Sequence, residues 1–85
     1  MVDFFSVNFS SILKILHEKE IKSVEISPEL QCLKFQSNAR TTIFMYVSQF
    51  GFEVKQQEIW GNEVEVNNHL FKDQDELESW LKEWF

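Results

Sequence analysis

The segment that decides the fold is NARTTIFMYVSQF, residues 38–50. Its composition favours a strand, because β-branched and aromatic residues fill most of positions 41–47. Three features favour a helix instead. Ser37 and Asn38 are good N-cap residues, apolar residues recur at helical spacing, and Gly51 stands where a left-handed C-cap glycine belongs. We therefore expect a helix over 38–50 and keep a strand as the alternative. The apolar stripe of this helix would be Ala39, Ile43, Val47 and Phe50.

The sequence predicts a β-hairpin on each side of this segment. Polar and apolar residues alternate in both, which is typical of strands with one buried face. Pro28 marks the turn of the first hairpin, because proline fixes φ and suits the second turn position, and Gly61-Asn62 marks the turn of the second. The four expected strands cover residues 21–27, 30–36, 52–60 and 63–67.

A helix is predicted near each end of the chain. The first is expected over about 6–19, after the apolar lead-in Phe4 and Phe5. The last begins at Asp73 and Glu76, a pair three residues apart that is typical of helix starts. The apolar stripes are Phe5, Phe9, Ile12, Leu13 and Leu16 in the first helix, and Leu77, Trp80, Leu81 and Trp84 in the last.

Together these elements predict an α+β fold in one domain, residues 1–85. Its order is helix–hairpin–helix–hairpin–helix, with a four-stranded antiparallel sheet and the helices packed on one face. If residues 40–50 form a strand instead, the fold becomes a helix, a longer meander and a closing helix. A chain of 85 residues has room for one core only, and 44% hydrophobic and 15% aromatic residues make that core dense.

The composition also excludes several classes of protein. The chain is too apolar to be disordered, and its single cysteine, Cys32, can form neither an intramolecular disulfide nor a cysteine-rich zinc site. No apolar run approaches the roughly 18 residues of a membrane helix, so no membrane partner is expected. The lone cysteine and the lack of a basic secretory signal predict a cytoplasmic protein.

The net charge of −6 belongs to one part of the chain. Residues 1–50 hold five acidic and five basic residues, whereas residues 51–85 hold nine acidic and three basic ones. This charge repels phosphate, so direct nucleic-acid binding is not expected, but it attracts a protein with a basic surface. In the second hairpin, Glu53 or Glu58 is expected close to Glu63 and Glu65, because neighbouring strands bring such residues within about 5 Å.

We expect the acidic residues of the second hairpin and the last helix to bind a partner, with Trp60 at the hairpin tip as an anchor. The alternatives are that the glutamates only make the hairpin soluble, that acids at a helix start only complement its dipole, and that Trp60 folds back onto the core. The candidate binding residues are Glu53, Glu58, Trp60, Glu63, Glu65, Asp73, Asp75 and Glu76.

The sequence carries no recognisable catalytic or metal-binding constellation. His17 is expected near a helix C-terminus and His69 at a strand end or loop, both in structural roles. Cys32 lies in mid-strand among apolar residues, where cysteines are usually inert. His17, Glu18 and Glu20 lack the spacing that would place three ligands on one helix face. We therefore expect no enzyme activity, no metal and no cofactor.

The sequence thus predicts a non-catalytic protein-binding or inhibitor protein that acts through an acidic surface. Its size and charge resemble those of nuclease-immunity proteins, antitoxins and phage-encoded anti-restriction or anti-CRISPR inhibitors, which implies a nucleic-acid-handling enzyme as the target. The alternative is a structural or regulatory homodimer, or an accessory subunit, with an apolar aromatic interface. Apolar residues outside the main stripes would either supply that interface or, buried on a second side, simply enlarge the core: Phe4, Val7, Ile15, Phe44, Met45 and Phe85.

Overall fold

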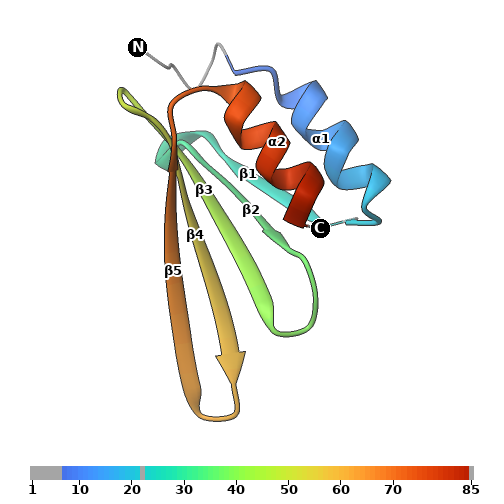
Figure 1. Cartoon of the computed structure of the whole chain (residues 1–85), viewed down its shortest axis with the longest axis vertical. Coiled ribbons are helices and arrows are strands. Elements are labelled where there is room, and N and C mark those ends of the chain that lie inside the picture. The colour runs from blue at the N-terminus through green and yellow to red at the C-terminus, as the bar shows by residue number, and fades with distance from the viewer. Residues whose placement is uncertain (1–6, 22, 85) are drawn as a thin grey trace.

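The computed structural model describes residues 7–21 and 23–84 (Figure 1). Along the chain, one helix precedes the five strands of these residues and another follows them, with a single turn of 3₁₀-helix after the first strand. The predicted lead-in residues Phe4 and Phe5 and the terminal Phe85 lie outside the described residues. The elements are α1 Phe9–Glu18, β1 Val24–Ser27, η2 Pro28–Leu30, β2 Cys32–Gln36, β3 Thr41–Ser48, β4 Gly51–Trp60, β5 Glu63–Phe71 and α2 Gln74–Trp84.

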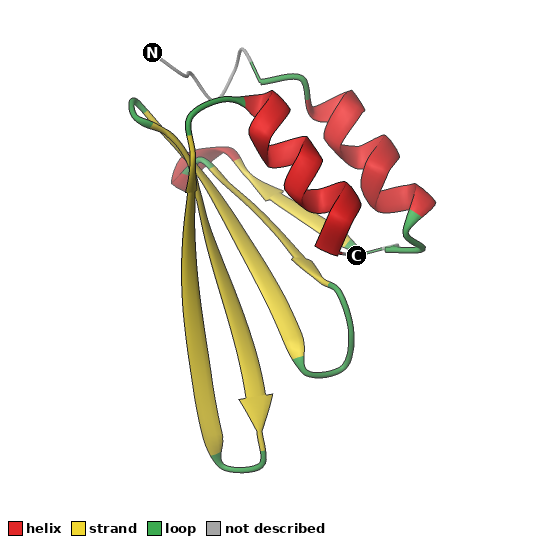
Figure 2. Cartoon of the chain, in the orientation of Figure 1, coloured by secondary structure: helices red, strands yellow, loops and turns green. Residues whose placement is uncertain are grey.

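The strands form one antiparallel meander in the order β1-β2-β3-β4-β5. Both helices cover the same face of this sheet, which we call the inner face; the opposite, outer face carries no helix of the described residues (Figure 2). The helices run parallel and side by side. Asn8 and Gln74 exchange two hydrogen bonds near their N-terminal ends, and the Lys19 ammonium donates to the Lys82 carbonyl oxygen (2.8 Å) near their C-terminal ends.

The predicted fold is wrong at its centre. Thr41–Ser48 is the middle strand of the sheet and not a helix, so the described chain has five strands rather than four and two helices rather than three. The alternative, a longer meander between a first and a closing helix, matches the structure. Side chains of β3 alternate between burial on the inner face (Ile43, Met45) and half-burial on the outer face (Phe44, Tyr46). A central strand with neighbours on both sides favours such β-branched and aromatic residues.

The features that favoured a helix have other roles. Ile43 and Val47 are four residues apart and share a face in a strand as well as in a helix. The Asn38 side chain accepts hydrogen bonds from the backbone N–H groups of Arg40 (2.8 Å) and Thr41 (3.0 Å), and so stabilises the turn before β3 instead of a helix start. Gly51 opens β4 rather than closing a helix.

The terminal helices and the pairing within each hairpin agree with the sequence prediction. β1 pairs with β2, and β4 pairs with β5. β5 continues to Phe71, beyond its predicted end at residue 67. The start of α2 is capped by Asp73, whose Oδ1 accepts the Glu76 N–H (2.9 Å), as the predicted pair requires.

The core lies between the two helices and the inner face of the sheet. Each fully buried apolar side chain there stabilises the fold by about 1.5–3 kcal/mol. Ile15 and Met45, which lie outside the predicted stripes, belong to this core, and Val7 packs against it. The core residues with the least exposure are Ile12, Leu16, Leu33, Phe35, Ile43, Met45, Phe52, Val54, Leu77 and Leu81.

Candidate protein-binding surface

The hairpin of β4 and β5 extends well beyond the helices, so its distal half is not covered by them (Figure 1). Its register runs without interruption from Phe52 opposite Phe71 to Trp60 opposite Glu63. Near the helices, Phe52 and Val54 are buried, whereas every residue from 59 to 68 is exposed. The core therefore holds one end of the hairpin and presents the other end to solvent.

Three glutamates gather on the inner face of the projecting part. The register places Glu58 opposite Glu65 and Trp60 opposite Glu63, and alternate residues of a strand share a face. Glu58 therefore lies close to Glu65, as expected, whereas Glu53 lies opposite Leu70 and faces the outer side. Like charges opposite each other destabilise a sheet, by an amount of roughly 0.2–1 kcal/mol per pair. The hairpin retains this unfavourable pair.

Trp60 is fixed beside these glutamates. Its indole Nε1–H donates to Glu58 Oε2 (3.1 Å), and the Arg40 guanidinium lies 4.8 Å from the ring centroid. Gln56 Nε2 donates to the other carboxylate oxygen of Glu58 (2.9 Å). Trp60 keeps 49% of its surface exposed and does not fold back onto the core. Trp60 therefore presents its aromatic ring in a fixed orientation at the tip of the hairpin.

The remaining candidate residues lie at the other end of β5, around the start of α2. Two of them have structural roles there: Asp73 caps the helix, and Glu76 Oε2 accepts the backbone N–H of Lys72 (2.9 Å). Asp75 is exposed in the first turn, where the helix dipole favours an acid. The candidate residues thus divide into a hairpin group, a helix-start group and Glu53, which lies apart on the outer face.

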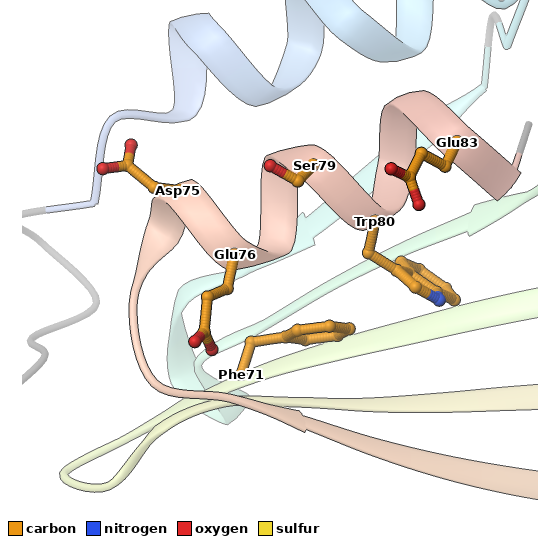
Figure 3. A pocket seen from close by; sticks show the side chains of 6 residues that line it. All are labelled: Phe71, Asp75, Glu76, Ser79, Trp80 and Glu83. Atoms are coloured by element: carbon orange, nitrogen blue, oxygen red, sulfur yellow. The ribbon is translucent and has the colours of Figure 1, made fainter.

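A shallow hollow of about 520 Å³ lies beside α2 and the end of β5 (Figure 3). The rings of Phe71 and Trp80, with centroids 5.5 Å apart, form its apolar part. In Figure 3 the Glu76 carboxylate points toward Phe71, while Glu83 lies one helical turn beyond Ser79. The lining residues are Phe71, Asp75, Glu76, Ser79, Trp80 and Glu83.

The hollow and the hairpin glutamates both lie along the inner face of β5. Phe71, Glu65 and Glu63 are alternate residues of β5 and face the inner side together. Between them, His69 packs against Trp80 with ring centroids 5.1 Å apart. We call this combined surface the acidic edge. It consists of Glu58, Glu63 and Glu65 at the hairpin end and Asp75, Glu76 and Glu83 at the helix end.

Sequence reasoning missed three participants in this surface. Arg40 reaches Trp60 only because β3 is a strand, which brings residue 40 beside the hairpin; the backbone N–H of Ile59 donates to its carbonyl oxygen (3.0 Å). Phe71 and Glu83 meet only through the packing of α2 on the sheet. For Phe71 a signal was present, since the run from residue 63 to 71 contains neither proline nor lysine and could continue as one strand.

The histidines and the cysteine lie away from the acidic residues at the hairpin tip. Cys32 is buried beside Tyr46; burial raises the pKa of its thiol, which is therefore protonated at neutral pH. His17 is exposed in the last turn of α1. His69 Nε2 is buried and has no hydrogen-bond partner within the described residues. In residues 7–21 and 23–84, no three acidic, histidine or cysteine side chains converge in a way that could hold a metal ion.

No known protein-family model matches this chain, and neither curated proteins nor solved structures show a significant similarity to it. None of the helices in the described part of the chain has the length and apolar character needed to cross a membrane.

Proposed function

We propose that this protein is a non-catalytic inhibitor that covers a basic surface of a partner protein with its acidic edge. One observation carries the proposal: Glu58, Glu63 and Glu65 share a face of a projecting hairpin with Trp60, which Glu58 and Arg40 hold half-exposed. A side chain that is already held loses little conformational freedom on binding, so Trp60 suits the role of an anchor. The carboxylates around it steer a basic partner toward the hairpin.

The partner class that fits this surface is a nucleic-acid-handling enzyme. Such enzymes bind phosphate backbones through basic grooves, and an acidic face competes for the same groove by electrostatic and steric blockade. The protein would then act as an immunity protein, an antitoxin or a phage anti-defence protein. It would work in the cytoplasm, where a free cysteine such as Cys32 stays reduced.

The test compares two charge-reversal variants on purified nucleases and restriction complexes that the protein inhibits. The variant Glu63→Lys/Glu65→Lys is expected to bind at least about tenfold more weakly than the natural protein, because it reverses two of the three hairpin glutamates of the acidic edge. The control Glu18→Lys/Glu29→Lys changes the net charge equally at exposed sites away from this surface. Binding of the natural protein should weaken steeply between about 50 and 300 mM salt. A partner held equally by both variants would refute the proposal.

A second candidate function is a homodimer or accessory subunit that uses an apolar interface. It is favoured by four exposed apolar side chains that share the outer face of the hairpin. Sedimentation decides between the two functions, since a strict monomer at tens of micromolar eliminates the homodimer. The four residues are Ile59, Val64, Val66 and Leu70, each exposing between 45% and 66% of its surface.

A further inference from the structure

β5 offers a free strand edge that is ready to pair. It lies at the end of the sheet, and none of the described residues pairs with the edge that points away from β4. Nine extended residues present an edge about 30 Å long, with every second residue directing its backbone N–H and C=O away from β4. Native edge strands are usually protected by proline, lysine, a bulge or short length, and the opposite edge β1 has four residues followed by Pro28. β5 has no proline, lysine or bulge, and the charges that it directs to the inner face, Glu63 and Glu65, are both acidic, so they oppose pairing with an acidic strand but not with a basic one.

The charges along this edge determine what can pair with it. Glu63 and Glu65 stand on β5 itself, Glu58 lies beside them on β4, and Asp75, Glu76 and Glu83 line the hollow at the other end. The nearby cation Arg40 is already engaged with Trp60. A second copy of this chain would bring equal negative charge to the same edge, whereas a basic segment would be attracted along its whole length.

The hollow at the end of β5 suits one long basic side chain. Its apolar part is Phe71 and Trp80, and the Glu76 carboxylate points toward Phe71, whereas that of Asp75 points away from both rings (Figure 3). A guanidinium group can lie against an aromatic ring while it binds a carboxylate, and the arginine stem packs on apolar surface. Because Phe71 faces the inner side, a residue paired opposite it directs its side chain toward this hollow.

We infer that an extended basic segment of the partner pairs with β5 as a sixth strand and places an arginine in the hollow beside Phe71. In antiparallel pairing, the arginine opposite Phe71 is followed six and eight residues later by basic residues opposite Glu65 and Glu63. Residues opposite Leu70, Val66 and Val64 face the outer side and are apolar. This inference rests on the proposed function in one respect, namely that the partner is basic.

The probe is the peptide acetyl-Arg-Val-Ser-Thr-Ser-Val-Lys-Val-Lys-amide, which has this pattern. Binding to the full chain is measured by fluorescence anisotropy, with a dye attached at the N-terminus of each peptide in place of the acetyl group. Replacing the arginine by citrulline, its neutral isostere, should weaken binding at least fivefold. A peptide with glutamate in place of both lysines should bind the Glu63→Lys/Glu65→Lys variant at least tenfold better than it binds the natural protein.

Two further peptides separate strand pairing from simple charge attraction. One carries N-methyl groups on alternate amides at odd positions, the other at even positions. Only one of these sets faces β5 in a paired strand, so one peptide should lose binding at least tenfold and the other should keep it. Equal binding of both methylated peptides, or no binding of the parent peptide at 1 mM, would overturn the inference.

The outcome is independent of the inhibition experiment. If a partner is bound through Glu63 and Glu65 but the methylated peptides do not differ, the acidic edge acts by charge alone and the strand inference fails by itself. If the peptides differ as expected but no nucleic-acid-handling enzyme is inhibited, the strand site stands and the proposed function fails. If the chain sediments as a dimer and the parent peptide binds only the monomer present at low protein concentration, a second copy occupies β5 in the dimer, against the inference.

Discussion

At the scale of single residues, the two glycines are required for different reasons. Gly51 has φ of +131°, and a Cβ at this position would clash with the Phe71 carbonyl oxygen. Gly61 has φ of +62° at the tip of the hairpin, and a Cβ there would meet no other atom within 4 Å. Both backbones favour glycine, but only Gly51 is also needed for the close approach of β4 and the end of β5.

Gly51→Ala should therefore destabilise the protein more than Gly61→Ala. We expect a loss of roughly 3 kcal/mol or more in the free energy of unfolding for Gly51→Ala, from backbone strain and the clash with Phe71 together. For Gly61→Ala we expect roughly 1 kcal/mol, from the left-handed backbone alone. Urea unfolding at 25 °C measures both. Equal losses would mean that the strands move apart at little cost.

At the scale of elements, β3 shows what the sequence could not decide. The spacing of Ile43 and Val47 fits either a helix or a strand, and Asn38 can cap either a helix or a turn. What selects the strand is pairing with β2 on one side and β4 on the other, which depends on residues far along the chain. The elements that were predicted correctly have local signals, such as the Gly61-Asn62 turn of the second hairpin.

The same distinction holds for the acidic edge. The hairpin group could be predicted, because a two-residue turn at Gly61-Asn62 fixes the register and places Glu58 opposite Glu65. The hollow could not, because it requires α2 to pack so that Trp80 meets Phe71. The role of Arg40 could not be predicted either, since its place beside Trp60 depends on β3 being a strand. Local signals therefore define the hairpin end of the surface, and tertiary packing defines the helix end.

The cap of α2 gives a prediction at this scale. Asp73→Ala should lower the free energy of unfolding by about 1 kcal/mol, because it removes the acceptor of the Glu76 N–H. Asp75→Ala is the matched control two residues further on: it changes the charge equally, and its contribution to the helix dipole is only about 0.3–1 kcal/mol. Thermal unfolding at low and high salt separates the two contributions, since salt screens the interaction with the helix dipole but does not remove the capping hydrogen bond. A loss at Asp73 that disappears in salt would contradict a capping role.

At the scale of the whole molecule, the shape follows from where the core ends. The chain measures 39 × 25 × 24 Å, and its long dimension runs along the hairpin that projects past the helices (Figure 1). The charge is arranged along the same direction, because the acidic edge follows β5 from the hairpin tip to α2. β5 thus carries the free edge together with Glu63, Glu65 and Phe71, while the other residues that would meet a partner lie beside it on β4 and α2.

This arrangement predicts that the hairpin opens without the rest of the molecule. Stability within a fold is lowest where few apolar side chains are buried, and residues 59 to 68 are all exposed. The comparison uses two amides of β4, a strand that pairs on both sides. Ile59 donates to the Arg40 carbonyl oxygen (3.0 Å) in the projecting part, whereas Val54 is fully buried near the helices.

Hydrogen exchange followed by NMR should show the Ile59 amide exchanging at least about tenfold faster than the Val54 amide. Equal rates would mean that the hairpin unfolds only with the core. A basic strand bound to β5 is released both by local opening of the hairpin and by global unfolding, so adding the arginine-containing peptide should slow exchange at Ile59 and at Val54. Slower exchange at Val54 alone would instead mean that the peptide stays bound when the hairpin opens, and so does not bind its projecting part.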